Sequence, residues 1–271
     1  MGSQILFLEK SKVDLDNVNA TLTVTDAVAS DTGQSIIDFV RNRNNSSSWL
    51  TTGSTDAADT EILIELGDTT NITDIILIDH NWKAYTIQYH NGTIFTDFSV
   101  AINETVNTST GTSYNFSSVS TTQLKIIIDS TQIVDADKRL GQLIITDRIG
   151  QLNAWPKINR PMVSLNKVKT KMLSGKTHVA ETTGFFACEL DVKILKLDAD
   201  LTLLESIYFS REGSLVWINA GDDAQFSSLR VGYRFRDIFL MRPIDEWNPE
   251  WHESIYTSGM KIKVKLQESV N

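Results

Sequence analysis

Cysteine is almost absent from this 271-residue chain, whose one cysteine is Cys188. A single thiol excludes an intramolecular disulfide and any cluster of thiolate ligands around a metal. Long apolar stretches are absent too, and without a run of about 18 apolar residues no transmembrane helix is predicted. The start of the chain, MGSQILFLEKSKVD, has an early Glu9 and only a short apolar run. It lacks the features of a secretory signal, so no signal peptide is predicted.

The motifs of several enzyme classes are also missing. There is no Gly-x-Ser-x-Gly, no phosphate-binding loop and no Gly-x-Gly-x-x-Gly, and no two histidines have the spacing of a helical zinc pair. Two carboxylate pairs have the residue types that glycoside hydrolysis requires: Glu61 with Glu65, and Asp222 with Asp223. The first pair alternates with isoleucines, which favours a solvated strand face, and the second follows a glycine in a predicted turn. We therefore predict no catalytic residues, no enzymatic activity and no cofactor.

Three acidic residues in one predicted loop are Asp129, Asp135 and Asp137. Carboxylate oxygens suit calcium, so these residues can form a calcium site. An ordinary acidic loop is the favoured interpretation, and no metal site is predicted.

Charge is distributed unevenly. Residues 1–150 hold 9 Lys and Arg against 19 Asp and Glu, a net charge of −10, whereas residues 151–271 hold 16 against 15, a net of +1. An acidic first part argues against a nucleic-acid partner, because phosphate contacts need Lys and Arg. The change in composition predicts two domains, residues 1–150 and residues 151–271.

The first domain has the composition of β-strands. Ile62–Leu66, Ile75–Ile78 and Tyr85–Tyr89 are rich in β-branched or aromatic residues and are bounded by turn-forming residues. A lone Trp49 precedes the first of them, and we expect it to be buried against the core. The run at residues 4–8 can be an edge strand or a terminal arm.

This domain resembles the galactose-binding-like jelly rolls of the discoidin or coagulation-factor C-type family. The resemblance covers roughly residues 15–148 and rests on Asp38, residues 42–45, Trp49, residues 62–67, 72–78 and 85–92, and the closing strands 123–129 and 140–147. It implies a jelly-roll β-sandwich with ligands on the loops at one end. The loop Asp79–Trp82 is then the candidate ligand site, with His80, Asn81 and Trp82 as the candidate ligand-binding residues, because its two rings and two polar groups suit sugar recognition. The alternative is that Trp82 packs beneath its own loop.

The second domain has long alternating strands and one helix, predicted at Asp198–Phe209 with an acidic N-cap. Two of its strands have lysine at every second position, and these lysines are the candidate assembly interface. Edge protection against aggregation and attraction to an acidic neighbouring subunit explain them equally well. The lysines are Lys167, Lys169, Lys171, Lys261, Lys263 and Lys265.

This second pattern resembles the β-barrel plus helix of phage tail-tube and distal-tail proteins. The residues behind the resemblance are 167–181, 185–195, 201–209, 236–241 and 258–268. One departure is that the sandwich precedes the tube-like domain here, whereas the tube domain comes first in distal-tail proteins. We therefore expect a mainly all-β chain: a jelly-roll sandwich followed by a β-barrel-like domain with one helix.

Two functional hypotheses follow. The first is a structural component of a phage tail or baseplate, located in the virion and synthesised in the host cytoplasm. Its partners are copies of itself in a ring and other tail proteins, with a cell-surface glycan as a further ligand and no nucleic acid or membrane insertion. The alternative is a carbohydrate-binding module of a secreted or surface protein.

Overall fold

The structure of the chain is a computed structural model. It describes residues 5–26, 37–42, 47–153, 157–164, 167–171, 177–181, 185–195, 198–210, 213–218, 238–244, 246–253 and 258–268.

Contacts within the chain divide it into two units. The sandwich unit is Ser11–Arg148, and the helix unit combines Met1–Lys10 with Ile149–Asn271. The predicted ranges 1–150 and 151–271 therefore need correction at the N-terminus, since the first ten residues belong with the second part of the chain. The sandwich unit is an insertion into the helix unit.

The sandwich unit is built on two long antiparallel strands, β4 (Thr60–Ile78) and β8 (Gly111–Thr131), which pair along most of their length. Their register shifts between Glu65 and Thr70 and again between Ile72 and Asp74. Such bulges bend a strand pair. Gly67 lies in the bend with a φ of 82°, and a Cβ there would be 2.4 Å from the Cβ of Asn19, so only glycine fits.

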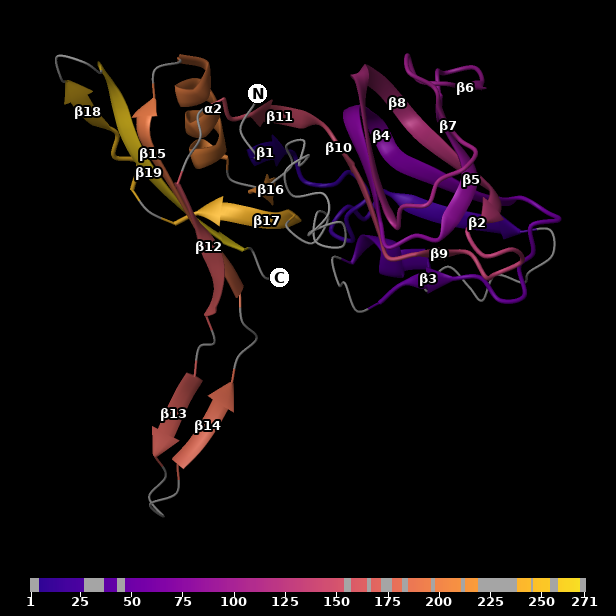
Figure 1. Cartoon of the computed structure of the whole chain (residues 1–271), viewed down its shortest axis with the longest axis horizontal. Coiled ribbons are helices and arrows are strands. Elements are labelled where there is room, and N and C mark those ends of the chain that lie inside the picture. Colours follow the sequence, from indigo (N-terminus) through magenta and orange to yellow (C-terminus); the bar gives the residue numbers. More distant parts are fainter. Residues whose placement is uncertain are drawn as a thin grey trace. The chain divides into compact units, whose positions relative to one another are not determined.

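The bend divides the two strands between two layers (Figure 1). The first half of β4 pairs with β2 (Thr21–Asp26), and its second half pairs with β10 (Gln142–Thr146). The second half of β8 continues one layer into β5, and β3 pairs with β9 in a separate small sheet. The remaining elements are η1 (Asp38–Arg41), β3 (Trp49–Leu50), β5 (Trp82–His90), β6 (Phe95–Thr96), β7 (Ile102–Glu104) and β9 (Arg139–Leu140).

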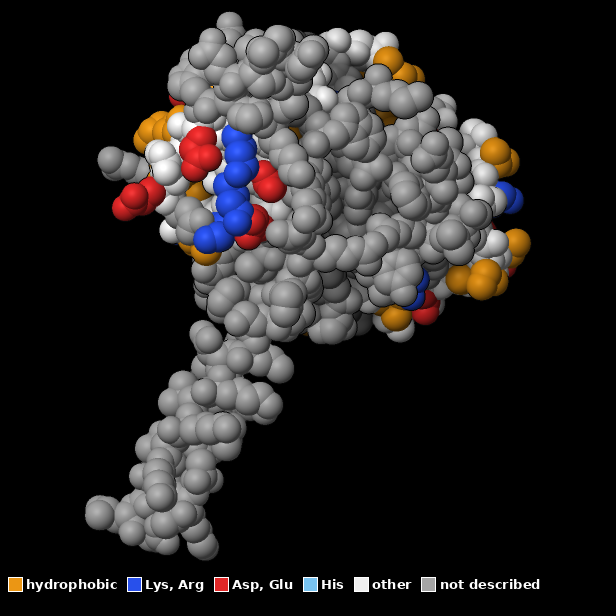
Figure 2. All heavy atoms as spheres, turned by 60° about the vertical axis from the view of Figure 1, so that its left-hand side comes forward, with side chains coloured by type: hydrophobic (Ala, Val, Ile, Leu, Met, Phe, Trp, Pro, Cys, Tyr) orange, Lys and Arg blue, Asp and Glu red, His pale blue; other side chains and the backbone are white. Residues whose placement is uncertain are grey.

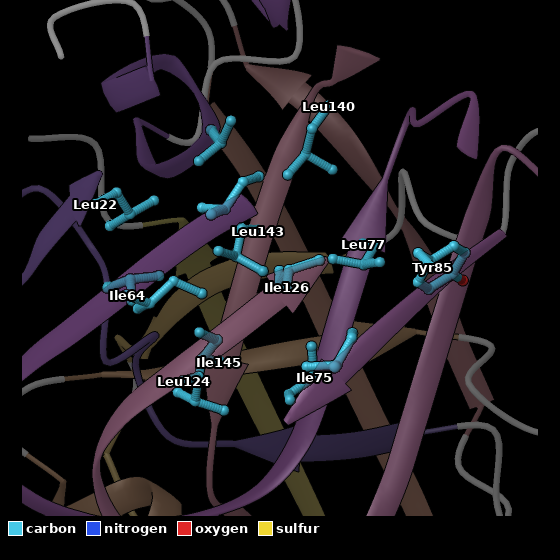
Figure 3. Packing of buried hydrophobic residues seen from close by; sticks show 14 of the residues in the cluster. Leu22, Ile64, Ile75, Leu77, Tyr85, Leu124, Ile126, Leu140, Leu143 and Ile145 are labelled. Carbon is cyan, nitrogen blue, oxygen red and sulfur yellow. The ribbon is translucent and has the colours of Figure 1, made fainter. Parts of the chain in front are cut away.

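Apolar side chains from both layers fill the space between them. Figure 3 shows Leu22, Ile64 and Ile126 of one layer close to Leu143 and Ile145 of the other. Trp49 is completely buried in the same cluster, as predicted. The mainly all-β fold class and the β-sandwich are therefore confirmed.

The helix unit is built on one large sheet, whose strand order is β11-β1-β16-β17-β19-β15-β12, with β18 paired to β19. Its strands are β1 (Ile5–Leu8), β11 (Arg148–Gln151), β12 (Lys157–Ser164), β15 (Phe185–Leu195), β16 (Ser214–Ile218), β17 (Ile238–Pro243), β18 (Glu250–Glu253) and β19 (Ser258–Glu268).

Strand β1 lies inside this sheet, between β11 and β16. All four of its side chains are buried, with Ile5 and Phe7 in the core of the helix unit. The edge strand or terminal arm considered for residues 4–8 is therefore wrong. A run of four apolar residues without polar alternation is the pattern of a strand buried on both faces.

The helix α2 (Asp198–Phe209) has the predicted bounds. Leu204 and Ile207 are buried in the core of the helix unit, with Leu201 packed beside them. Asp200 accepts hydrogen bonds from the main-chain N–H and the Nδ2 of Asn153, at 2.9 and 3.0 Å. Within the described residues no helix is long and apolar enough to cross a membrane.

Strands β13 (Lys167–Lys171) and β14 (Thr177–Glu181) form a two-stranded sheet of their own (Figure 1). They lie between β12 and β15 in the chain. Lys157 pairs with Asp191 near one end of the β12–β15 pair, and Lys167 pairs with Glu181 with the same offset. The register of the β12–β15 pair shifts by one residue between Asn159 and Met162, so the pair Ser164–Phe185, which is closest to β13 in the chain, departs from this offset.

We expect the two units to respond separately to core substitutions. Phe7→Ala should destabilise the helix unit by about 3–5 kcal/mol and leave the sandwich unit unchanged. Ile126→Ala should do the reverse, by about 2–5 kcal/mol. Differential scanning calorimetry of both variants measures this. A loss of sandwich stability in Phe7→Ala would show that β1 does not belong to the helix unit.

Candidate functional site

Several loops of the sandwich unit meet at one end. The main-chain N–H of Gln132 donates to the carbonyl of Asn81 at 2.8 Å, and that of His80 donates to the carbonyl of Thr110 at 2.9 Å. The N–H of Asp56 joins a further loop by donating to Oδ1 of Asp135 at 2.9 Å. We call this region the loop end. Its loops are residues 51–59, 79–81, 105–110 and 132–138.

Asn81 is the hydrogen-bonding centre of the loop end. Its Nδ2 donates to the carbonyl of Asp137 and its Oδ1 accepts from the N–H of Arg139, both at 2.8 Å. Its main-chain carbonyl accepts from Gln132 as well. Both ends of the Asn81 amide therefore hold the loop 132–138, which makes Asn81 a structural clamp.

The other two predicted ligand-binding residues, His80 and Trp82, are completely buried. Their ring centroids lie 5.2 Å apart, and the Trp82 ring meets that of Tyr85 edge-on at 5.5 Å. Rings without exposed surface cannot stack on a ligand. The structure therefore contradicts this part of the sequence prediction and shows the alternative, in which Trp82 packs beneath its own loop.

His80 is neutral in this core. The main-chain N–H of Trp82 donates to its Nδ1 at 3.4 Å, which leaves Nε2 as the protonated nitrogen facing the Thr112 hydroxyl at 3.2 Å. Burial, with a smaller contribution from the charge of Arg139, lowers the pKa of His80 to about 4.

From Thr112 the polar contacts continue toward the surface. The Tyr85 hydroxyl lies 3.1 Å from that of Thr112 and also hydrogen-bonds the hydroxyl of Tyr114. Tyr114 donates to Oε1 of Glu104 at 3.1 Å. Burial raises the pKa of both tyrosines, so they stay protonated. This series of hydrogen bonds ties β5, β7 and β8 together beneath the loop end.

The acidic residues of the loop end are used as caps for main-chain N–H groups. Oδ1 of Asp56 accepts from the N–H of Thr131 at 3.0 Å, and Oδ1 of Asp137 accepts from that of Ser54 at 3.1 Å. Oδ1 of Asp135 accepts from the main-chain N–H of Asp56. No group of three or more His, Cys, Asp or Glu side chains in the described residues is placed to hold a metal ion.

One charged pair at the loop end is exposed. Nη2 of Arg139 donates to Oδ1 of Asp79 at 2.8 Å. The side chain of Arg139 is 40% exposed and that of Asp79 is 52% exposed. The Nε of Arg139 has no partner among the described residues. Leu50 is directly opposite Arg139 in the β3–β9 pair and is 45% exposed. Cross-strand partners present their side chains on the same face.

The backbone at Asp79 is strained. Its φ is 56°, one of two positive values among the described non-glycine residues, and the other is at Asp135 in the same loop end. Such conformations cost on the order of 1–3 kcal/mol and cluster at binding sites. Gly141 packs against Asp79 so closely that a Cβ would lie 2.9 Å from that of Asp79. Asp79 belongs to the loop that the sequence predicts as the ligand site, whereas no sequence pattern indicates Arg139.

The lysines of β19 lie on an exposed face of the helix unit. Figure 2 shows a column of Lys and Arg side chains with Asp and Glu on both sides. In the strand register Glu250, Asp191 and Glu189 stand opposite Lys261, Lys263 and Lys265, and Lys263 forms an ion pair with Glu189. These lysines therefore have acidic neighbours in their own sheet. For Lys167, Lys169 and Lys171 the structure describes the strand but not the side chains.

Comparison with known proteins gives structural likenesses only. No family model and no curated protein matches the chain. One similar structure is the chitosan-binding module 1 of a chitosanase/glucanase from Paenibacillus sp. IK-5, with 15% identity, coverage of 48% of this chain and 97% of that one, and a TM-score of 0.38. A second is the family 32 CBM of NanJ from C. perfringens in complex with galactose, with 12% identity, 53% and 99% coverage, and a TM-score of 0.39.

A third similar structure is a GH29 fucosidase from Ruminococcus gnavus in complex with fucose, with 15% identity and a TM-score of 0.39. The match covers 51% of this chain and 26% of the fucosidase chain.

The buried neutral His80 predicts a pH dependence of stability. Its pKa is about 4 when folded and about 6.5 when unfolded, so the unfolded chain binds the extra proton between these values. The free energy of unfolding of the sandwich should therefore fall as pH decreases from about 6.5 to about 4, by up to about 3 kcal/mol from this group. Urea denaturation of the unaltered protein and of His80→Asn across this range measures the contribution.

His80→Asn should make the free energy of unfolding less dependent on pH, whatever its effect on absolute stability. His90→Asn, which removes a half-buried histidine from the end of β5, is the matched control and should keep the slope. If the free energy of unfolding falls equally with pH in His80→Asn and in the unaltered protein, His80 is not the group that causes the pH dependence.

Proposed function

We propose that the sandwich unit is a carbohydrate-binding module and that its ligand is held at the loop end by Asp79 and Arg139. The observation that carries this proposal is an exposed carboxylate–guanidinium pair on strained backbone, fixed from below by buried hydrogen bonds. Binding sites are built in this way, with exposed polar groups held by a rigid shell. The site differs from the predicted His80, Asn81 and Trp82, although Asp79 belongs to the same loop.

The chemistry of the pair suits sugar hydroxyls, which both donate and accept hydrogen bonds. Asp79 uses Oδ1 for Arg139, and its Oδ2 accepts from a hydroxyl, while the guanidinium donates to the neighbouring oxygen. Leu50 offers an apolar contact for the C–H face of a ring. Because the two charges cancel within a strongly acidic unit, the ligand is a neutral glycan rather than a polyanionic one.

Glycan-array screening followed by calorimetric titration tests this proposal. Asp79→Ala and Arg139→Ala should each weaken binding at least about 30-fold, since a hydrogen bond to a charged group is worth about 2 kcal/mol or more. Glu61→Ala is the control, because it removes a carboxylate that pairs with Lys125 at 3.7 Å on the sheet. If the screen finds a glycan whose affinity survives both substitutions, the ligand lies elsewhere.

We also propose that the helix unit makes the chain an assembly subunit of a phage tail, baseplate or related particle. The hairpin of β13 and β14 favours this second function. Each strand pairs only with the other among the described residues. An isolated two-stranded ribbon is marginally stable in water, and unpaired strand edges accept a further strand. A neighbouring copy or a tail partner that adds a strand supplies the missing pairing.

Replacing residues 165–184 by a short turn tests the assembly function. The shortened hairpin should leave both calorimetric transitions in place, because β13 and β14 pair with neither large sheet. It should abolish ring or tube formation, as measured by light scattering and electron microscopy. Normal assembly of this variant, or a full-length chain that stays monomeric with every candidate partner, would rule the hairpin out as the interface.

A further inference from the structure

Lys138 is a completely buried lysine at the loop end. Its Nζ donates to the main-chain carbonyls of Thr55 at 3.2 Å and Ala58 at 2.9 Å. Its main-chain N–H donates to the Thr51 hydroxyl at 2.8 Å, and its carbonyl accepts from the N–H of Thr51 at 3.0 Å. Lysine is rarely buried without compensating partners, because removing an ammonium from water is costly.

The surroundings of this ammonium are a set of oxygen atoms. Besides binding the two carbonyls, the ammonium acts through its charge on the carboxylate of Asp129. Burial and the charge of Asp59 raise the pKa of Asp129, while Lys138 lowers it. Main-chain carbonyl oxygens are also among the ligands that a calcium ion takes in proteins. Here the positive charge is part of the chain.

The position of Lys138 connects it to the proposed glycan site. It is the residue before Arg139, whose N–H is held by Asn81. The two carbonyls that it binds lie in the loop 51–59, whose Asp56 holds the N–H groups of Thr131 and Asp135. The ammonium therefore joins the loop 51–59 to the segment that carries Arg139.

We propose that Lys138 is the positioning residue of the loop end, a tethered cation that organises the glycan site without a bound metal ion. This inference rests on the proposed function for its effect on binding, whereas its effect on the order of the loops stands independently. Charge is the essential property: the ammonium, more than its aliphatic stem, holds the carbonyls of Thr55 and Ala58.

Two substitutions separate charge from packing. Lys138→Met keeps the stem and removes the charge, and should lower the unfolding temperature of the sandwich by about 10 °C or more, because two partly buried carbonyls lose their donor. It should weaken glycan binding at least about 10-fold. Lys125→Met is the matched control: it removes an ammonium that pairs with Glu61 on the sheet and should leave affinity unchanged.

Lys138→Ala removes three carbons and the ammonium group, which together correspond to n-propylammonium, and leaves a cavity of that size. Millimolar n-propylammonium chloride should raise its unfolding temperature, and 1-propanol, of the same length but neutral, should not. Equal recovery with both would show that packing is what Lys138 supplies, and would overturn the proposal. If the alanine variant does not fold, the comparison of Lys138→Met with the unaltered protein decides, and unchanged stability in Lys138→Met would equally overturn it.

Metal independence is tested on the unaltered full chain. Neither calcium chloride nor EDTA should change the unfolding temperature of the sandwich, and a shift with calcium would show that a metal organises the loops instead. If the unaltered chain binds no glycan at all, the proposed function fails, while the thermal comparisons still decide the role of Lys138.

Discussion

The pairing of two bent strands determines the shape of the sandwich unit. Thr60 at the start of β4 pairs with Ile128 near the end of β8, and Ile78 at the end of β4 pairs with Gly111 at the start of β8. Because both strands turn over at the same bulges, each begins and ends at the loop end. The convergence of loops is therefore a property of this strand pair, and the binding site depends on it.

Beneath the converging loops, buried polar groups take the place of a purely apolar core. His80 and Lys138 are completely buried and Asn81 is half-buried, and each makes hydrogen bonds with main-chain or hydroxyl groups of the loops. Such a network tolerates few alternative arrangements, because any partly satisfied state leaves a costly unpaired group. The rigidity of the loop end allows Asp79 to keep its strained conformation.

The sequence predicts local features here far better than long-range ones. Trp49 and the helix at Asp198–Phe209 follow from composition and periodicity within a few neighbouring residues. The chemistry of His80 and Trp82 is right for sugar binding, but burial decides their role and is set by strands far along the chain. Asp79 and Arg139 are 60 positions apart, and only the fold brings them together. The predicted ligand loop 79–82 already contains Asp79, whereas nothing near Arg139 in the sequence indicates that it lies beside this loop.

The insertion of one unit into the other affects how the chain is made. Ile5–Leu8 is translated before the sandwich unit, yet one of its two neighbouring strands, Ser214–Ile218, follows more than two hundred residues later. The sandwich unit, whose pairs all lie within 11–148, can be complete by then. Until β16 is made, β1 therefore has only β11 beside it, and its second edge in the sheet stays unpaired. Translation speed and chaperones that shield short apolar segments thus bear on the yield of the folded protein.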